Sequence, residues 1–332
     1  MDKTFDQSRY VSTGHLPPEE RVARLVDEAY ERFKADSQGR TSSVYPSLEA
    51  ASGDLFGLCV AGTDGKLYAT GDWTFEFPVM SVSKPFVFAL VCEALGAEAA
   101  REAIGVNATG LAFNALEAID RNPDGRTNPM VNPGAIAATG LVPGATAGEK
   151  WRVIQEGLSR FAGRSLAVNE PTFACASASN IRNRDIAKRL ASLHKLSLAP
   201  EEVLDLYTRQ CSLDVSAKDL AVMGATLADG GVNPVTGERV IGPEACKCAL
   251  AVMATAGLYE KSGDWLYDVG LPGKSGISGG IVAVSPGKGA LGAYAPLLNE
   301  AGNSVKGQLA ARFLSERLGL NLFASKPLVE RI

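Results

Sequence analysis

The sequence predicts an α/β protein of the α+β type, with one antiparallel sheet flanked by helices and an inserted helical subdomain. Two hairpin patterns, one in residues 55–70 and one in residues 280–294, supply strands from opposite ends of the 332-residue chain. Between them, from about residue 84 to residue 256, apolar residues recur mainly at helical spacing. A sheet assembled from both chain ends around a helical insertion buries these patterns most economically.

The N-terminal part predicts one helix followed by a hairpin. Apolar residues at helical spacing indicate an amphipathic helix over residues 18–34. Residues 55–61 and 67–70 have the composition of two strands, and the segment between them contains Asp64 and Gly65, a pair typical of hairpin turns. The second hairpin and a final helix are expected at the C-terminal end.

The middle of the chain predicts seven helices, which are expected over residues 84–95, 135–141, 150–161, 183–193, 200–210, 216–229 and 243–256. After them, residues 280–284 and 289–294 form the second hairpin pattern, and residues 303–318 a C-terminal helix. We therefore expect a sheet subdomain from residues 1–75 and 257–332. Residues 76–256 should form a mainly helical subdomain, and the two together one catalytic unit.

Composition and charge argue against several classes of protein. The net charge is −4 and Lys and Arg are dispersed, which is not typical of a nucleic-acid-binding surface or a polybasic membrane anchor. The first residues lack a basic segment followed by an apolar one, and no run approaches 18 uncharged apolar residues. We expect a cytoplasmic enzyme that acts on a small molecule.

Ser81 and Lys84 have the S-x-x-K spacing that places a serine hydroxyl and a lysine amine on one helical turn. Residues 77–80 should hold the chain extended, and the apolar helix that follows would desolvate the lysine. Because an ordinary lysine, with a pKa of about 10.4, is almost fully charged at neutral pH, desolvation is needed for Lys84 to act as a base. The alternative is a helix-capping serine and a solvated lysine.

A second motif, Lys274-Ser275-Gly276, has the composition of a strand edge that lines such a site. Only two histidines exist, and neither His15 nor His194 lies in a glycine-rich loop, so a Ser-His-Asp triad has little to draw on. A lysine or tyrosine base is therefore favoured.

Several longer blocks resemble the serine-dependent glutaminases. The resemblance covers roughly residues 45–318, and its blocks lie at residues 110–114, 128–136, 227–240, 270–281 and 302–307. It implies a fold like the serine β-lactamases and penicillin-binding proteins, and hydrolysis of the side-chain amide of L-glutamine to L-glutamate and ammonia. It also implies a homodimer or homotetramer and no metal or organic cofactor.

The resemblance also assigns roles to residues. Ser81 matches the nucleophile, Lys84 its base and Tyr259 a tyrosine that shares proton transfer. The substrate-contacting positions of the family match Tyr45, Asn132, Asn183, Tyr207 and Ile277, the last through a backbone N–H in the oxyanion hole. Without the resemblance, the two asparagines could be turn or capping residues, Tyr207 and Tyr259 core aromatics, and Tyr45 an extended-chain residue before proline.

Two positions depart from the family pattern. Met80 stands where the family usually has Gln, and Ala176 where it has a glutamate that would pair with the α-ammonium of glutamine. Three hypotheses remain open: a glutaminase with a rearranged pocket, an amidase for an ω-amide without the α-ammonium, and a catalytically silent ligand-binding protein. The second would act on an amide such as a keto-acid or dicarboxylic monoamide.

Overall fold

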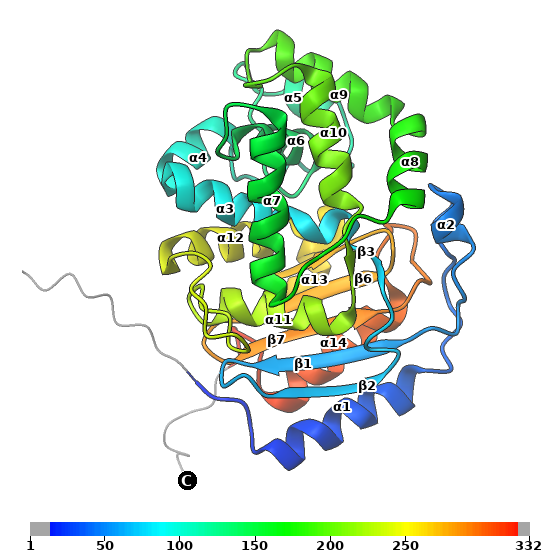
Figure 1. Ribbon diagram of the computed structural model, residues 1–332. Helices are drawn as coiled ribbons and strands as arrows, with labels where there is room; N and C mark the ends of the chain where they lie inside the picture. The colour runs from blue at the N-terminus through cyan, green and yellow to red at the C-terminus, as the bar shows by residue number, and fades with distance from the viewer. Residues whose placement is uncertain (1–13, 325–332) are drawn as a thin grey trace, which may run out of the picture.

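The computed structural model describes residues 14–324, which contain one five-stranded antiparallel sheet with helices on both faces (Figure 1). The strand order is β2-β1-β7-β6-β5, so the C-terminal strand β7 lies between β1 and β6. The predicted assembly of one sheet from both chain ends is confirmed. The strands are β1 (Gly57–Gly62), β2 (Leu67–Gly71), β5 (Gly273–Ser275), β6 (Gly280–Ser285) and β7 (Gly289–Tyr294).

The sheet separates two hydrophobic cores because successive strand residues point to opposite faces. Leu58 and its alternate neighbours pack against α1 (Glu19–Phe33) and α14 (Val305–Leu318). Cys59 and the residues in phase with it face α11 (Ala217–Ala228) on the other side. Strands β1, β6 and β7 are thus buried on both faces, which explains their continuous apolar runs, whereas the edge strand β2 is only partly buried.

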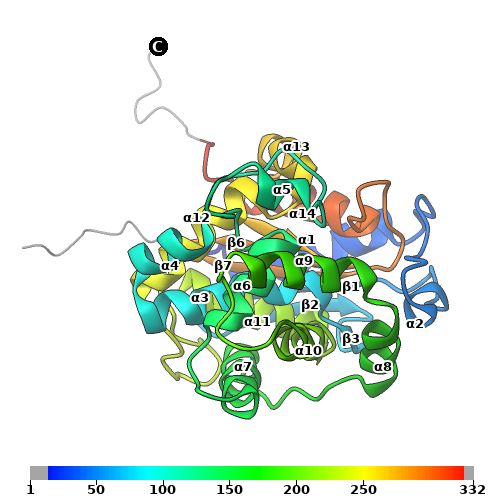
Figure 2. The same cartoon turned by 90° about the horizontal axis from the view of Figure 1, so that it is seen from above.

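All seven helices predicted in the middle of the chain are present. They are α3 (Lys84–Leu95), α6 (Asn132–Leu141), α7 (Ala147–Ala162), α9 (Ile181–Ser192), α10 (Pro200–Cys211), α11 (Ala217–Ala228) and α12 (Pro243–Ala256). Of these, α11 packs on the sheet itself, whereas α6 contacts α3, α9 and α10 above it (Figure 2). The division into subdomains at residues 76 and 256 stays a prediction.

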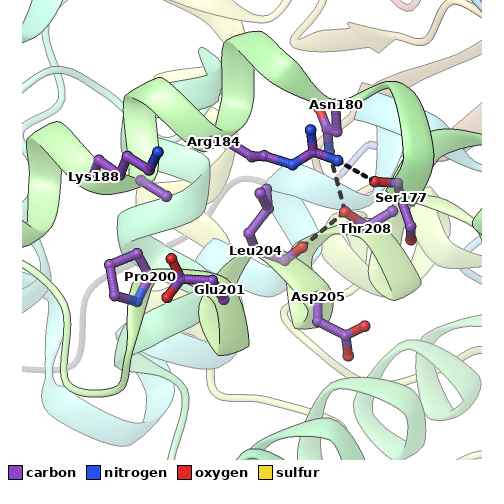
Figure 3. A pocket seen from close by; sticks show the side chains of 10 residues that line it. Ser177, Asn180, Arg184, Lys188, Pro200, Glu201, Leu204, Asp205 and Thr208 are labelled. Carbon is purple, nitrogen blue, oxygen red and sulfur yellow. Dashed lines mark hydrogen bonds between the residues drawn. The ribbon is translucent and has the colours of Figure 1, made fainter.

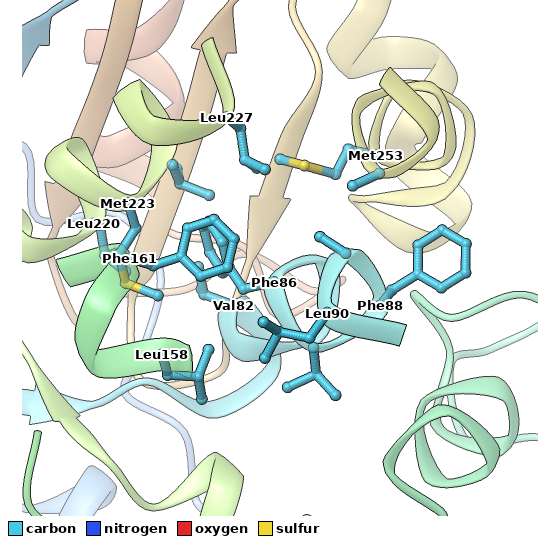
Figure 4. Close-up of a cluster of buried hydrophobic side chains, with 14 of the residues drawn as sticks. Val82, Phe86, Phe88, Leu90, Leu158, Phe161, Leu220, Met223, Leu227 and Met253 are labelled. Carbon is cyan, nitrogen blue, oxygen red and sulfur yellow. The ribbon is translucent and has the colours of Figure 1, made fainter. Parts of the chain in front are cut away.

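Helix α3 carries Lys84 and is buried along almost its whole length. Phe86 on this helix meets Phe161 of α7, with ring centroids 5.1 Å apart, and Met223 of α11 and Met253 of α12 belong to the same core (Figure 4). This core also includes sheet residues such as Val282. The apolar helix that follows Ser81 therefore forms part of the largest hydrophobic core.

Several short elements were not predicted. They are α2 (Pro46–Glu49), α4 (Ala97–Ile104), α5 (Glu117–Asp120), α8 (Glu170–Ser179), α13 (Ser262–Asp268) and the antiparallel pair β3 (Phe77–Pro78) and β4 (Asp214–Val215). Helix α8 shows why: its sequence is mostly small residues with no apolar stripe, and the side chain of Asn169 caps it by accepting the N–H of Thr172.

The prediction of extended backbone over residues 77–80 is wrong for its second half. Only Phe77 and Pro78 are extended, because they pair with β4. Val79 is helical, and Met80 has φ +48°, in the left-handed region that non-glycine residues rarely adopt. A chain reversal is needed here, since the segment passes from a strand directly into a helix. Among residues 14–324, no helix is long and apolar enough to cross a membrane.

Candidate active site

One cavity of about 240 Å³ lies between the helical layer and the end of the sheet. It is lined by six of the residues singled out from the sequence: Ser81, Tyr45, Asn132, Asn183, Tyr207 and Ile277. They come from segments that are far apart in the chain. The fold therefore brings the predicted nucleophile and all five predicted substrate-binding positions to one place.

Ser81 lies in η1 (Met80–Ser83), a single 3-10 turn that leads directly into α3. Lys84 is the first residue of α3, so the S-x-x-K spacing spans the junction of the two helices. The preceding residue, Met80, is buried and left-handed. Such a conformation costs on the order of 1–3 kcal/mol and is found preferentially at functional sites.

Lys84 is fully buried and forms no ion pair with any described residue. Its Nζ donates hydrogen bonds to Asn132 Oδ1 at 2.7 Å and to the carbonyl of Met130 at 3.2 Å. Both acceptors are neutral, so they do not compensate for the loss of hydration. Burial accordingly lowers the pKa of Lys84 to about 7, with the Cys211 thiol opposing the shift. A large fraction of the amine is neutral at physiological pH.

Tyr259 is also buried and, like Met80, has a positive φ, +57°. Its hydroxyl forms no hydrogen bond with any described residue that meets ordinary geometry. Burial raises the pKa of Tyr259 above its usual range, and the nearby Ser81 hydroxyl opposes part of that rise. The phenol thus lies near the Ser81 hydroxyl, and its role in proton transfer stays a prediction.

Lys274 is a second buried lysine at this site, and its side chain was not anticipated from the sequence. Its Nζ lies 4.0 Å from the ring centroid of Tyr259. The Nζ of Lys84 lies 5.8 Å from the same centroid. The Nζ of Lys274 donates to the carbonyl of Ser275 at 2.7 Å. Burial, followed by repulsion from Lys84, lowers the pKa of Lys274 well below its usual value. The Lys-Ser-Gly triplet is the sequence signal for this lysine, but its composition alone indicates only a strand edge that lines the site.

Asn132 connects the lysine to the substrate-binding side of the cavity. Its Oδ1 accepts from Lys84 and, at 3.3 Å, from the Tyr207 hydroxyl, while its Nδ2 donates to Asn183 Oδ1 at 2.8 Å. Asn132 also begins α6, with Pro133 in the first turn. These hydrogen bonds fix the orientation of the Asn132 amide, so this side chain does more than form a turn.

Two backbone N–H groups at the cavity are available to a ligand. No described hydrogen bond uses the N–H of Ser81 or that of Ile277, although both residues line the cavity. The chain next to Ile277 approaches closely, because a Cβ on Gly276 would lie only 3.1 Å from the carbonyl oxygen of Val79. Two such donors can stabilise the oxyanion of a tetrahedral intermediate.

Met80 and Ala176, the two departures from the family pattern, both line the cavity. None of the described lining residues is Asp or Glu. The lining includes one permanently charged side chain, that of Arg182, whose Nε donates to the carbonyl of Asn114 at 3.1 Å. The wall is therefore more suited to a negative group than to an isolated ammonium.

A second depression of about 270 Å³ adjoins the first (Figure 3). The two share Asn180 and Thr208, whose side chains are joined by a 3.2 Å hydrogen bond. Lys188 and Glu201 lie on opposite sides of it. It contains none of the residues predicted for catalysis.

Within residues 14–324, no three His, Cys, Asp or Glu residues are grouped so that they could hold a metal ion. That no metal or organic cofactor is needed stays a prediction. The chemistry available from the described side chains is that of a serine, two buried lysines and a tyrosine. On a sheet flanked by helices, a serine three residues before a buried lysine defines a serine-dependent amidohydrolase of the β-lactamase-like fold.

The chain belongs to the glutaminase family. The model of the family described as Glutaminase matches residues 39–323. Glutaminase 2 of Yersinia pestis is 64% identical over 322 residues, which cover 97% of this chain and 95% of that protein. The glutaminase of Colwellia psychrerythraea is 42% identical, over 92% of this chain and 99% of that protein.

Solved structures agree. A structure described as probable glutaminase YbaS has a TM-score of 0.91 and 38% identity, and the match covers 93% of this chain and 100% of that one. A structure described as Mglu in its glutamate form has a TM-score of 0.86 and 37% identity, over 94% of this chain and 71% of that one. The resemblance stated from the sequence and the β-lactamase-like fold it implied are both confirmed.

Proposed function

We propose that this protein hydrolyses the side-chain amide of L-glutamine to L-glutamate and ammonia through an acyl-enzyme on Ser81. The observation that carries the proposal is the buried amine of Lys84, held without a counter-charge three residues after a serine in a cavity. Family membership supports the reaction, and the glutamate form of Mglu indicates that a relative of the same fold holds the reaction product.

The first half-reaction forms the acyl-enzyme. Neutral Lys84, directly or through the Tyr259 hydroxyl, accepts the proton of Ser81 Oγ while Oγ bonds to the amide carbon. The oxyanion accepts hydrogen bonds from the backbone N–H groups of Ser81 and Ile277. The same lysine and tyrosine then return the proton to the amide nitrogen, the C–N bond breaks and ammonia leaves.

The second half-reaction repeats these steps with water. Water takes the place of ammonia, loses its proton to the Lys84 and Tyr259 pair and attacks the ester carbon. The Ser81 Oγ–C bond breaks, and Oγ regains the proton. Lys274, beside the Tyr259 ring, has its own pKa lowered by burial and by repulsion from Lys84, so a positive charge on Lys274 is unfavourable while Lys84 carries the proton.

The test is ammonia release from L-glutamine by the wild-type protein and by Ser81→Ala. The variant should lose at least about a thousandfold in kcat, because it lacks the acyl acceptor. It should also lose labelling by a fluorophosphonate. Ser192→Ala is the matched control, since Ser192 and Lys195 share the S-x-x-K spacing but neither lines the cavity. Retention of more than a few per cent of activity in Ser81→Ala would contradict the proposal.

A second candidate substrate is an ω-amide without the α-ammonium. The absence of Asp and Glu from the described cavity lining, together with Arg182, favours it. If this candidate is correct, kcat/KM should be higher for the monoamide of glutaric or 2-oxoglutaric acid than for L-glutamine. The double change Met80→Gln with Ala176→Glu should then shift the preference towards L-glutamine. A higher kcat/KM for L-glutamine in the unmodified protein rejects this candidate and retains the first.

Two further properties are proposed for this chain, its cellular location and its oligomeric state. A cytoplasmic location is proposed. It agrees with the six free cysteines, which are expected in a reducing compartment. A homodimer or homotetramer is proposed from the family resemblance, and light scattering of the purified protein measures it.

A further inference from the structure

A chain of hydrogen bonds between buried polar side chains lies directly behind Ser81. Thr139 Oγ1 on α6 donates to Gln210 Oε1 on α10 at 3.0 Å. Gln210 Nε2 donates to Ser83 Oγ at 3.1 Å, and Ser83 Oγ donates to the carbonyl oxygen of Met80 at 2.9 Å. All three side chains are 0% exposed. Their burial makes each of these hydrogen bonds costly to lose.

The direction of this chain follows from the orientation of the Gln210 amide. Its oxygen faces Thr139 and its Nε2 donates to Ser83, which leaves the single Ser83 proton for the Met80 carbonyl. The single proton of Thr139 lies between two acceptors at 3.0 Å, Gln210 Oε1 and the carbonyl oxygen of Ala135.

The acceptor at the end of the chain is the carbonyl of the peptide bond that carries the Ser81 N–H. No peptide bond among the described residues is cis. In a trans peptide the C=O and N–H groups point in opposite directions. With the Met80 carbonyl held inward by Ser83, the Ser81 N–H points the other way, and it has no acceptor among the described residues.

The hydrogen bond from Ser83 also restrains the carbonyl of Met80, a residue with an unfavourable backbone conformation. Met80 has φ +48°, which a methionine does not adopt without support from its surroundings. Rotation of the Met80–Ser81 peptide changes ψ of Met80 and φ of Ser81, and it would turn the Met80 carbonyl away from Ser83 Oγ. It would also move the Ser81 N–H, and with it the placement of Oγ.

We propose that Gln210 and Ser83 are positioning residues that fix the Met80–Ser81 peptide plane and so direct the Ser81 N–H into the cavity. Neither side chain touches the substrate in this scheme. The inference rests on the proposed role of Ser81 as nucleophile and adds to it the means by which its turn is held.

The first experiment compares Ser83→Ala with Ser285→Ala. Ser285 is a matched control, because it is also buried and donates to a carbonyl, that of Leu320 at 3.1 Å, away from the cavity. Ser83→Ala should lower kcat for L-glutamine 10- to 100-fold with KM changed less than threefold, and slow phosphonate labelling of Ser81 similarly. Ser285→Ala should leave both rates within twofold. Thermal unfolding of both variants separates loss of fold from loss of rate.

Rates within twofold of wild type in folded Ser83→Ala would overturn the proposal. So would an equal loss of kcat in Ser285→Ala, since that would reflect stability alone. Gln210→Leu, which removes the donor but keeps the volume, should lower kcat 5- to 20-fold. The double variant should be no slower than Ser83→Ala alone, because both act on one hydrogen bond. Independent, multiplying effects would contradict a shared role.

A crystal structure of Ser83→Ala gives a test that does not depend on the chemistry of Ser81. The Met80–Ser81 peptide should rotate, with changes in ψ of Met80 and φ of Ser81. An unchanged peptide overturns the proposal even if activity falls. A rotated peptide in a protein whose wild type neither labels at Ser81 nor releases ammonia supports the positioning role and rejects the proposed function.

Discussion

Lys84 shows how one buried side chain connects sequence, structure and chemistry. Its position at the start of an apolar helix places the amine in the core, where only neutral oxygens of Met130 and Asn132 accept its hydrogen bonds. The low pKa follows from this environment, and so does the capacity to act as a base. The same environment makes the charged form unfavourable in the folded state, so catalysis and stability respond to one titration.

The rate of glutamine hydrolysis should rise with pH through an apparent pKa near 7, because the base must be neutral. Below that value, kcat/KM should fall about tenfold per pH unit. The apparent pKa belongs jointly to Lys84, Tyr259 and Lys274, which lie close together. The measurement is a pH–rate profile from pH 5.5 to 9 with solvent buffers matched in ionic strength. A flat profile with chemistry rate-limiting would count against neutral Lys84 as base.

Lys84→Met should make the folded protein more stable at pH 7, by roughly 1–3 kcal/mol after loss of two hydrogen bonds. The pKa is about 7 in the folded state and 10.5 in the unfolded chain. Between these values only the unfolded chain binds the proton, so wild-type stability rises with pH. The gap between variant and wild type should therefore shrink by up to about 1.4 kcal/mol per pH unit. Urea unfolding at pH 7, 8, 9 and 10 measures it, and a constant gap contradicts the burial argument.

At the scale of the element, α11 is held against the sheet by glycines. A Cβ on Gly292 of β7 would lie 2.0 Å from the carbonyl of Ala217, and one on Gly224 of α11 would lie 2.6 Å from the Cβ of Ala290. These contacts explain why Ala290 and Gly292, two β7 positions that face α11, are small and why this helix approaches the sheet so closely. The sheet and α11 therefore form one tightly packed unit beneath the catalytic helix α3.

Gly292→Ala should destabilise the protein by about 2–3 kcal/mol, because the methyl group meets backbone that cannot move without shifting α11. Gly148→Ala is the matched control. Gly148 lies in α7 with nothing within 4 Å of an added Cβ, so the change should raise stability by about 0.5 kcal/mol through helix propensity. Thermal unfolding of both variants is the measurement. Equal effects of the two substitutions would refute the close-approach argument.

At the scale of the whole molecule, the largest hydrophobic core contains residues from both of the subdomains expected from the sequence. It contains Cys59 and Val282 from the sheet together with Phe86 and Phe161 from the helical layer. The cavity likewise takes Tyr45 and Ile277 from the sheet-forming ends and Asn132 from the middle. A substrate bound there contacts both parts.

The protein should consequently unfold in a single cooperative transition. Tryptophan fluorescence and far-UV circular dichroism should give coincident urea curves, because the largest core joins the two parts, although each part also has a smaller core of its own. Trp265 lies beside the sheet and Trp151 in the helical layer, so the fluorescence reports both. Two separated transitions would instead show that the sheet and the helices fold independently.

The sequence by itself determined the elements whose signal is local. Hairpin turns, capping residues and the helical spacing of apolar residues act between near neighbours, so both hairpins and all seven middle helices were predicted from it. The S-x-x-K spacing is local too, but it also occurs at Ser192 and Ser285, so the assignment of Ser81 and Lys84 as nucleophile and base depends on the longer family blocks. Element boundaries and short helices without an apolar stripe, such as α8, lacked such a signal.

Only the tertiary structure decided the properties that depend on distant segments. The low pKa of Lys84, the burial of Lys274 against Tyr259 and the hydrogen bond from Gln210 to Ser83 all arise from contacts between residues that are not neighbours in the chain. Desolvation and hydrogen bonding act through space, and a one-dimensional pattern carries no information about which segments will surround a given side chain. For that reason the sequence indicated the proposed catalytic residues, and the fold determines the environment of their side chains.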